Sequence, residues 1–207
     1  YTICNRILQD FPNFKIFGID NLSRPGSEKN VSSLNSLGVK FVRADIRNHS
    51  DIDSLPKVDW VIDCAANPSV LAGMNEQSSC RQLMEHNLLG TINLLEYCKR
   101  HKSGLILLST SRVYSALELA NLPVESSNDR FEVTNTKIQG FSEQGISEEF
   151  PTSAPISLYG SSKLASEQLI LEYSYNFDFP VWINRCGVLA GAGQFGKADQ
   201  GIFSFWI

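Results

Sequence analysis

The segment Leu105-Ile-Leu-Leu-Ser-Thr-Ser111 carries the pattern that decides the fold, a short apolar run followed directly by hydroxyl side chains. A continuous apolar run of this length is typical of a parallel strand that is covered on both faces. Four other segments share the pattern and also end in polar or small residues. They are 15–19 before Asp20-Asn21, 40–43 before Asp45-Ile46, 59–64 before Ala65-Ala66, and 180–184 before Arg185-Cys186-Gly187.

Helical patterns lie between these runs. Apolar residues recur at helical spacing over 80–100 and 162–177, and the residues before Pro12 are typical of the end of another helix. The alternation predicts an α/β fold with a doubly wound parallel sheet, in which ligands bind beyond the carboxyl ends of the strands. The segment 116–155 has little periodicity, and we predict a long functional loop there.

Composition excludes several classes of protein. A chain of 207 residues with 43% hydrophobic and 19% charged residues is ordinary for one soluble domain. The net charge of −4 gives no broad basic surface, so we expect no nucleic-acid partner, and the absence of a long apolar run predicts no membrane insertion. The five cysteines form no C-x-x-C pair and the three histidines have no ligand spacing, so we expect no metal site and a cytoplasmic protein with reduced thiols.

Tyr159-Gly-Ser-Ser-Lys163 holds the most informative pair of side chains. Residues four apart lie on the same face of a helix, so Lys163 can place its ammonium near the phenol of Tyr159. A free phenol titrates near ~10, and a base at neutral pH needs a shift of roughly 3 units, or about 4 kcal/mol. A nearby cation can supply that shift. Tyr159 would then remove a proton from an alcohol; the alternative is two solvated side chains.

Thr110, at the end of the run 105–108, offers a hydroxyl to the same chemistry. It could share a hydrogen bond with a substrate alcohol and with Tyr159. The alternative is a residue that only forms the turn after the strand.

Three short segments suit a dinucleotide. In such a fold, an acid at the position of Asp20 accepts hydrogen bonds from the adenosine ribose and favours NAD over NADP, although Asp-Asn is also an ordinary turn. Asp45-Ile46 could frame the adenine, or only end a strand. Ala65-Ala66 would let the cofactor approach closely, or only allow tight packing.

The glycine-rich phosphate loop is expected about 20 residues before Asp20. The residues before Asp20 contain no such loop, so we expect the chain to begin inside the first crossover helix. The string Gly191-Ala-Gly-Gln-Phe-Gly196 has the spacing, but too few residues follow it for a helix and a second strand. We interpret it as a flexible loop.

Taken together, these strings resemble the extended short-chain dehydrogenase/reductase family of nucleotide-sugar epimerases and dehydratases. The resemblance runs in family order through segments shared over nearly the whole chain. They are Asp20-Asn-Leu-Ser23, Asp45-Ile-Arg47, Ala65-Ala66, Asn87, Gly90-Thr-Ile-Asn-Leu-Leu-Glu96, Ser109-Thr110, Val113-Tyr114, Tyr159-Gly-Ser-Ser-Lys163 and Arg185. Within the family, Ser109–Tyr114, the insertion before Tyr159 and Gln194-Phe195 with Asp199-Gln200-Gly201 are most similar to the CDP-paratose (CDP-tyvelose) 2-epimerases.

The resemblance implies a Rossmann-like NAD-binding domain over 1–207, without the first strand, the glycine loop and most of the substrate domain. It implies three catalytic residues: Thr110, Tyr159 and Lys163. The implied cofactor-binding residues are Asp20, Asn21, Asp45, Ile46, Ala65, Ala66, Lys163, Cys186 and Gly187. The implied substrate-binding residues are Ser111, Gln194, Asp199 and Gln200.

The implied reaction is epimerisation of a nucleotide sugar through a transient keto-sugar, at C2 of a CDP-dideoxyhexose. Ser111-Arg112 replaces the acid pair that serves dehydratases, so dehydration is disfavoured. The alternatives are a UDP-sugar 4-epimerase with the same tyrosine and lysine, and a catalytically silent NAD(H)-binding sensor or scaffold. Relatives often dimerise through two helices, for which 80–100 and 162–177 are the candidates.

Overall fold

A computed structural model describes residues 1–72, 74, 79–134, 137–191, 193, 194 and 196 of the chain. All five predicted strands are present and parallel, and the predicted Rossmann-like α/β fold is confirmed. Their bounds are β1 Phe17–Asp20, β2 Lys40–Arg43, β3 Trp60–Asp63, β4 Gly104–Thr110 and β9 Val181–Cys186.

The strands form two parallel sheets, β1–β2 and β3–β4–β9, with β4 central in the second. Leu105 and Leu107, on one face of β4, are fully buried, whereas Ile106 and Leu108 on the other face are only partly buried, so the predicted burial of both faces is incomplete. Among the described residues, no strand of the β1–β2 sheet is paired with a strand of the β3–β4–β9 sheet. Instead, the Asn93 amide donates to the Ile46 carbonyl (2.7 Å), and Ile19 and Ile46 pack on the core beside β4.

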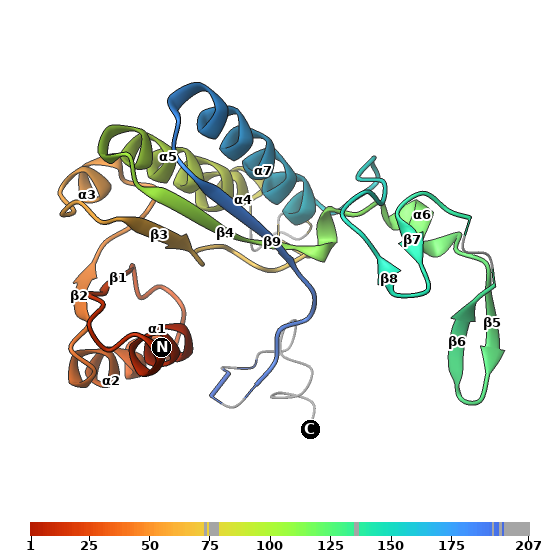
Figure 1. Cartoon of the computed structure of the whole chain (residues 1–207), viewed down its shortest axis with the longest axis horizontal. Helices are drawn as coiled ribbons and strands as arrows, with labels where there is room; N and C mark the ends of the chain where they lie inside the picture. The colour runs from red at the N-terminus through yellow and green to blue at the C-terminus, as the bar shows by residue number, and fades with distance from the viewer. Residues whose placement is uncertain (73, 75–78, 135–136, 192, 195, 197–207) are drawn as a thin grey trace.

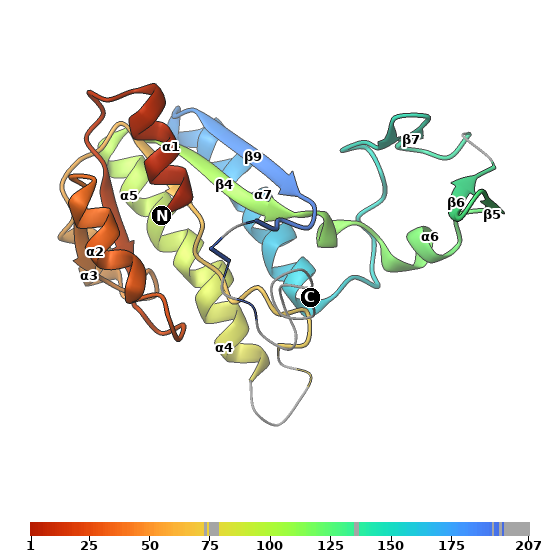
Figure 2. The same cartoon turned by 90° about the horizontal axis from the view of Figure 1, so that it is seen from below.

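The helices lie in two layers (Figures 1 and 2). One layer holds α4 Cys80–Met84, a π-helical turn η1 over Glu85–Leu89, α5 Gly90–His101 and α7 Leu158–Phe177. The other side carries α1 Thr2–Asp10 and α2 Lys29–Ser36, and the short α3 His49–Asp53 precedes β3. The predicted helix over 80–100 therefore exists with a π-turn in its middle, and α7 begins early enough to include Tyr159.

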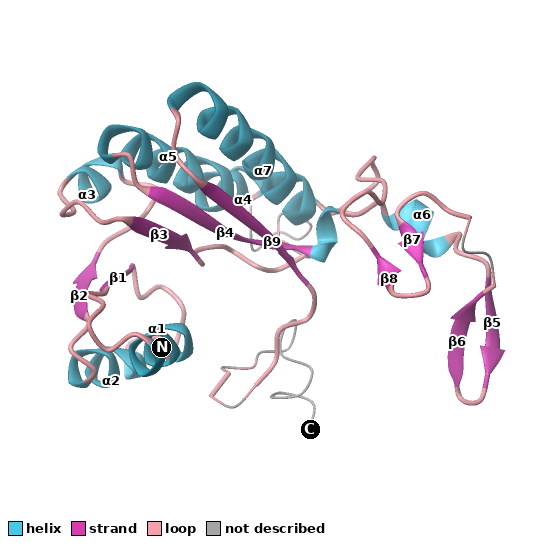
Figure 3. Cartoon of the chain, in the orientation of Figure 1, coloured by secondary structure: helices cyan, strands magenta, loops and turns pink. Residues whose placement is uncertain are grey.

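The segment after β4 departs from the prediction of a long loop. It holds a 3-10 turn η2 Ser111–Val113, α6 Ala116–Ala120, a hairpin of β5 Val124–Ser127 and β6 Arg130–Val133, and a second hairpin of β7 Phe141–Ser142 and β8 Gly145–Ile146 (Figure 3). Asn128 (φ 43°) and Asp129 (φ 66°) form the first turn, because these residue types tolerate the left-handed conformation that tight hairpins need.

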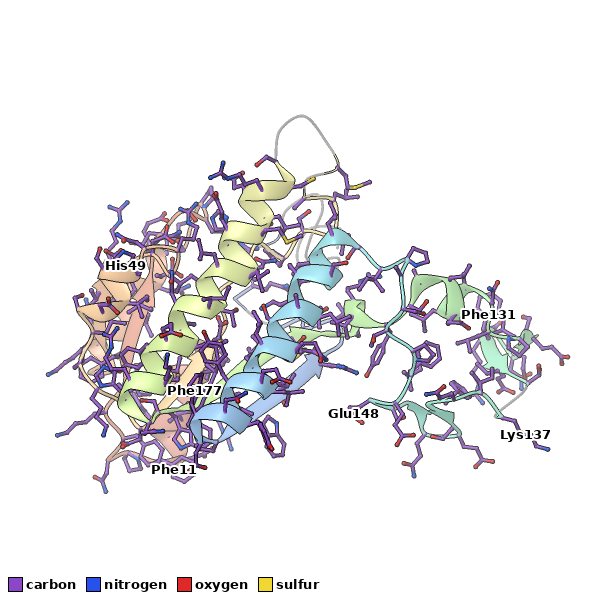
Figure 4. All side chains as sticks on the ribbon, turned by 90° about the horizontal axis from the view of Figure 1, so that it is seen from above. Phe11, His49, Phe131, Lys137, Glu148 and Phe177 are labelled. Atoms are coloured by element: carbon purple, nitrogen blue, oxygen red, sulfur yellow. The ribbon has the colours of Figure 1, made fainter. Side chains whose placement is uncertain are left out.

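This segment, residues 114–150, projects from the sheet as an arm, with Phe131 towards its far end (Figure 4). Its base is anchored by apolar packing. Phe150 is 1% exposed and meets the Tyr114 ring edge-on, with 5.8 Å between the ring centroids. The Ser115 amide also donates to the Pro151 carbonyl (2.8 Å). The arm therefore leaves and rejoins the domain beside η2, next to the end of β4.

Candidate active site

The carboxyl ends of β3, β4 and β9 meet at one edge of the sheet, because all three strands are parallel. Asp63 ends β3, Thr110 ends β4, and Cys186 ends β9 directly opposite Thr110 in the strand register. The sequence predicted this edge as the site, and most of the predicted residues around Tyr159 lie here.

Thr110 and Tyr159 are brought together across this edge. Thr110 ends β4, and its Oγ1 accepts a hydrogen bond from the Arg112 amide (3.1 Å), which begins the η2 turn. Tyr159 lies in the first turn of α7, whose N-cap Ser157 accepts from the Gly160 amide (2.9 Å). Both side chains are buried, and Thr110 is near enough to the Tyr159 hydroxyl to lower its pKa.

The pKa of Tyr159 moves opposite to the sequence prediction. Burial raises it above the ordinary phenol value, Thr110 opposes the rise, and Cys186 adds to it. The predicted lowering by Lys163 is therefore wrong for this structure. Its physical reason is the depth of the phenol, which disfavours the phenolate and which the sequence pattern does not reveal.

Lys163 is 1% exposed, one turn beyond Tyr159 on α7. Its ammonium acts on the buried carboxyl of Asp63, lowering a pKa that burial raises. Asp63 also accepts hydrogen bonds from the Ala65 amide (3.0 Å) and the Thr91 hydroxyl (3.2 Å). A buried cation thus faces a buried acid, both beneath the edge that carries Thr110 and Tyr159.

Gly160 permits the close approach of α7 to the η2 turn. A Cβ atom at this position would overlap the carbonyl oxygen of Arg112. We expect Gly160→Ala to lower the free energy of unfolding by about 1–3 kcal/mol, because one of the two segments must move. Urea denaturation would measure it, with Gly187→Ala as the control, where an added Cβ meets nothing within 4 Å. Equal losses in the two variants would contradict this account of Gly160.

Glu167, one turn beyond Lys163, forms the best-buried ion pair of the site. Arg185 at the end of β9 donates to it through Nη2 (2.8 Å) and Nε (3.1 Å), and their side chains are 17% and 3% exposed respectively. Ser109 also donates to Glu167, and the Arg185 guanidinium lies 5.2 Å from the centre of the Tyr114 ring. Arg185 further donates to the Glu148 carbonyl, so the pair joins α7, β4, β9 and the arm.

The residues predicted for the adenosine end gather at the ends of β1 and β2. Asp20 is exposed and accepts from the Leu22 amide (2.7 Å). The side-chain amide of Asn21 donates a hydrogen bond to the Asp45 carboxylate (3.0 Å). Arg47 donates two more to the same carboxylate, from Nε to Oδ1 (3.0 Å) and from Nη2 to Oδ2 (2.6 Å). Asp45 is therefore held by protein donors where the sequence predicted an adenine amino group.

The Asp45 carboxyl is expected to stay ionised at unusually low pH. Hydrogen bonds from Arg47, helped by Asn21, hold its pKa well below the ordinary value near ~3.9, against the opposing effect of burial. Because the folded pKa is the lower one, the stabilisation is present above the unfolded pKa and is lost as pH falls towards the folded pKa. A carbon-13 NMR titration should show a low midpoint that Arg47→Gln raises and the distant Arg81→Gln leaves unchanged. An ordinary midpoint in the unsubstituted protein would contradict the bidentate contact.

The other predicted site residues make few contacts with the residues described above. Ala65 is exposed just beyond β3, and Ala66 beside it is partly exposed. Because both side chains are methyl groups, a ligand at this edge could approach the backbone closely. Gly187 follows β9, and Ser111 opens η2 directly after Thr110. The Gln194 amide donates to the Leu189 carbonyl (3.3 Å). The two other predicted substrate-binding residues, Asp199 and Gln200, lie outside the described residues.

The sequence patterns assigned no role to the supporting polar residues Asp63 and Glu167, and Asn87 was named only among the residues that carry the family resemblance. Each is at most 2% exposed, yet the two helical ones were hidden in ordinary amphipathic patterns. The one available signal was the spacing of Tyr159, Lys163 and Glu167, which places three polar side chains on one face of α7.

Other kinds of site find no support in the described part of the chain. No group of three His, Cys, Asp or Glu side chains there could hold a metal ion. Likewise, no helix among those residues is long and apolar enough to cross a membrane.

Comparison with known proteins shows the family to which the chain is related. Residues 2–207 match the family described as the NAD dependent epimerase/dehydratase family. The CDP-paratose 2-epimerase of Salmonella typhi is 32% identical over 185 residues, covering 88% of this chain and 52% of that protein. The dTDP-D-glucose 4,6-dehydratase of Dictyostelium discoideum is 30% identical, covering 91% of this chain and 41% of that protein.

Among solved structures, the UDP-glucuronic acid 4-epimerase of Bacillus cereus in complex with NAD aligns with a TM-score of 0.66. It is 28% identical, covering 93% of this chain and 54% of that one. The chain thus spans about half the length of the relatives it matches.

Proposed function

The chain belongs to the NAD dependent epimerase/dehydratase family, and from this premise we propose that the protein is an NAD-dependent nucleotide-sugar epimerase. The observation that carries the proposal is that Thr110 at the end of β4, Tyr159 in the first turn of α7 and Lys163 one turn further along the same helix face are all buried at this edge. A hydroxyl, a phenol and an ammonium at a strand edge are the groups needed to take a proton from an alcohol.

The residues at this edge suit NAD. Asp20 and Asp45 follow neighbouring parallel strands, and their carboxylates accept hydrogen bonds of the kind that ribose hydroxyls and the adenine amino group donate. Ile46 would lie against the adenine, with Asn21 beside Asp45. The exposed Ala65 and the partly exposed Ala66 leave room for close approach, while Lys163 would hold the second ribose and Cys186-Gly187 the carboxamide. When bound, NAD supplies a reversible hydride acceptor.

In the proposed reaction Tyr159 takes the proton of a sugar hydroxyl as the carbon loses hydride, which leaves a keto-sugar. Thr110 holds first the hydroxyl and then the carbonyl oxygen. Burial raises the pKa of Tyr159, so phenolate formation would need positive charge beyond what acts on the phenol in this structure, and the nicotinamide of bound NAD would add its charge to that of Lys163. After the keto-sugar turns over, Tyr159 returns the proton and the carbon regains hydride on its other face, which inverts it.

We place the inversion at C2 of a CDP-dideoxyhexose. Support comes from the similarity to the CDP-paratose 2-epimerase and from the residues after Thr110. Dehydration needs a carboxylic acid to expel water, and Ser111 and Arg112 follow Thr110 instead. The second candidate is a UDP-sugar 4-epimerase, supported by the structural similarity to an enzyme of that class. The homodimer through α5 and α7, the cytoplasmic location and the division of the chain into domains remain predictions.

The test is proton NMR of the full-length protein incubated with NAD and, separately, with CDP-paratose and UDP-glucose. Inversion at C2 of the CDP-sugar alone is expected. Inversion only at C4 of the UDP-sugar would replace the first choice by the second. NAD binding without turnover of any nucleotide sugar would overturn the proposal in favour of a silent NAD-binding protein.

A further inference from the structure

We propose that Arg112 is a further substrate-binding residue, which holds the diphosphate of the nucleotide sugar beside the reacting carbon and thereby favours reaction at C2; this rests on the proposed function. Arg112 lies in the η2 turn, two residues after Thr110. The guanidinium of arginine is planar and always charged, and its fork of donors matches the oxygens of a phosphate group.

The backbone of Arg112 is fixed between the two residues that would handle the sugar hydroxyl. Its amide donates to Oγ1 of Thr110 (3.1 Å) at the end of β4. Its carbonyl oxygen lies against Gly160, where an added Cβ atom would overlap it, and Gly160 directly follows Tyr159 in α7. The root of the Arg112 side chain is therefore held at the junction of Thr110 and the first turn of α7.

The side chain of Arg112 is exposed at this edge of the sheet. Within the same turn, Val113 is fully buried, so the turn directs one side chain to the core and the other to the solvent. In the part of the chain that the structure describes, no carboxylate forms an ion pair with Arg112. An anion that approaches Thr110 would therefore meet a guanidinium without a competing acid from those residues.

Two other cations at this edge already face acids. Lys163 acts on the buried carboxyl of Asp63, and Arg185 is bound by Glu167 (2.8 Å). Neither could neutralise a diphosphate without giving up part of its interaction with its acid. Arg112 is thus the better placed of these cations to receive the negative charge that a nucleotide sugar brings.

The chemistry of the substrate decides how close that charge comes. The anomeric carbon C1 of a nucleotide sugar carries the diphosphate, and C2 is bonded directly to C1. If Thr110 holds the hydroxyl at C2, the diphosphate lies next to that hydroxyl, within reach of a long side chain in the following turn. With C4 at Thr110, the sugar ring would separate Thr110 from the diphosphate. Binding of the diphosphate by Arg112 therefore favours the orientation that inverts C2.

The matched variants are Arg112→Gln and Arg100→Gln, which each remove one exposed guanidinium. Arg100 lies near the end of α5, shortly before β4 begins, and pairs with Asp53 (2.8 Å). It therefore stands towards the opposite end of β4 from Thr110. Arg112→Lys keeps the charge but loses the fork of donors. The experiment measures kcat and KM for CDP-paratose by proton NMR in full-length protein saturated with NAD, together with the thermal midpoint of each variant.

The expected result is a KM about 10–100-fold higher in Arg112→Gln, the ratio that corresponds to the loss of a hydrogen bond to a charged group. The value of kcat should stay within about threefold, because the diphosphate is bound equally before and during the reaction. Arg112→Lys should lie between Arg112→Gln and the unsubstituted protein. A KM for Arg112→Gln within about twofold of the Arg100→Gln value, or a loss confined to kcat, would overturn the inference.

A binding measurement separates this inference from the proposed function. Calorimetry compares CDP with cytidine on full-length protein saturated with NAD. Relative to Arg100→Gln, Arg112→Gln should bind CDP about 10–100-fold more weakly and cytidine equally well. If the unsubstituted protein turns over no nucleotide sugar, the proposed function fails, and this comparison still decides. Equal changes for CDP and cytidine, or no measurable binding of CDP by the unsubstituted protein, would overturn the role of Arg112.

Discussion

Tyr159→Phe is expected to lower kcat for the proposed epimerisation by about 10²–10⁴-fold, the contribution typical of a positioned acid or base. The ring and its packing remain, and only the hydroxyl that meets Thr110 is lost. Because phenylalanine has no proton to give or take, both half-reactions should slow. Affinity for the nucleotide sugar should change little, since most of that binding energy lies away from the reacting carbon.

The measurement is product formation by NMR together with single-turnover NADH absorbance in the full-length protein. Tyr173→Phe provides a matched control on the same helix. Its hydroxyl donates to Glu96 (2.7 Å), so it loses one hydrogen bond without touching the sheet edge. A Tyr159→Phe protein that keeps kcat within about threefold of this control would remove Tyr159 as the base, since a positioned base contributes far more.

Glu167→Ala is expected to lower the free energy of unfolding by about 3–5 kcal/mol, because it leaves the largely enclosed guanidinium of Arg185 without its partner. The pair is far more enclosed than the exposed Arg81–Glu85 pair, where the Arg81 side chain is 87% exposed. Glu85→Ala is therefore the control, with an expected loss of about 1 kcal/mol or less.

Urea denaturation of the two variants gives the comparison. A double variant, Glu167→Leu with Arg185→Met, separates the pair from the packing around it, because apolar replacement of both partners removes the unpaired charge. It should lose less stability than Glu167→Ala alone. If Glu167→Ala costs no more than Glu85→Ala, the ion pair does not hold α7 to β9.

The sequence was sufficient for the strands and for the place of the site. Runs such as Leu105–Leu108 are typical of parallel strands, and the residues that follow parallel strands meet at one edge of the sheet. The place of Thr110 could therefore be predicted, whereas Tyr159 begins a helix and was indicated by its spacing to Lys163. The arm was missed in part because its strands are short and partly exposed, so periodicity gives no signal there.

The supporting residues could not be predicted, for a different physical reason. Asn87 meets Asn67 and Ser162, which are 20 and 75 positions away in the chain. Such contacts depend on how helices pack, and a polar residue in a helix normally faces water. The predicted direction of the Tyr159 pKa shift was wrong for the same reason, because burial depends on the whole fold rather than on the spacing to Lys163.

The separation of the two sheets has a consequence for hydrogen exchange. Strand β4 is bonded on both sides and covered by α5 and α7, so its amides should open only with global unfolding. In the 207-residue chain taken alone, the pair β1–β2 is joined to that body by contacts such as the one from the Asn93 side chain to the Ile46 carbonyl, so its amides should open at lower free energy than those of β4. Asp20 and Asp45 both stand at the end of this looser unit, so adenosine bound there would slow exchange in β1 and β2 and leave β4 as it was. Binding of the adenosine end would therefore order β1 and β2, whereas the reacting end of the dinucleotide would bind to residues that are already rigid.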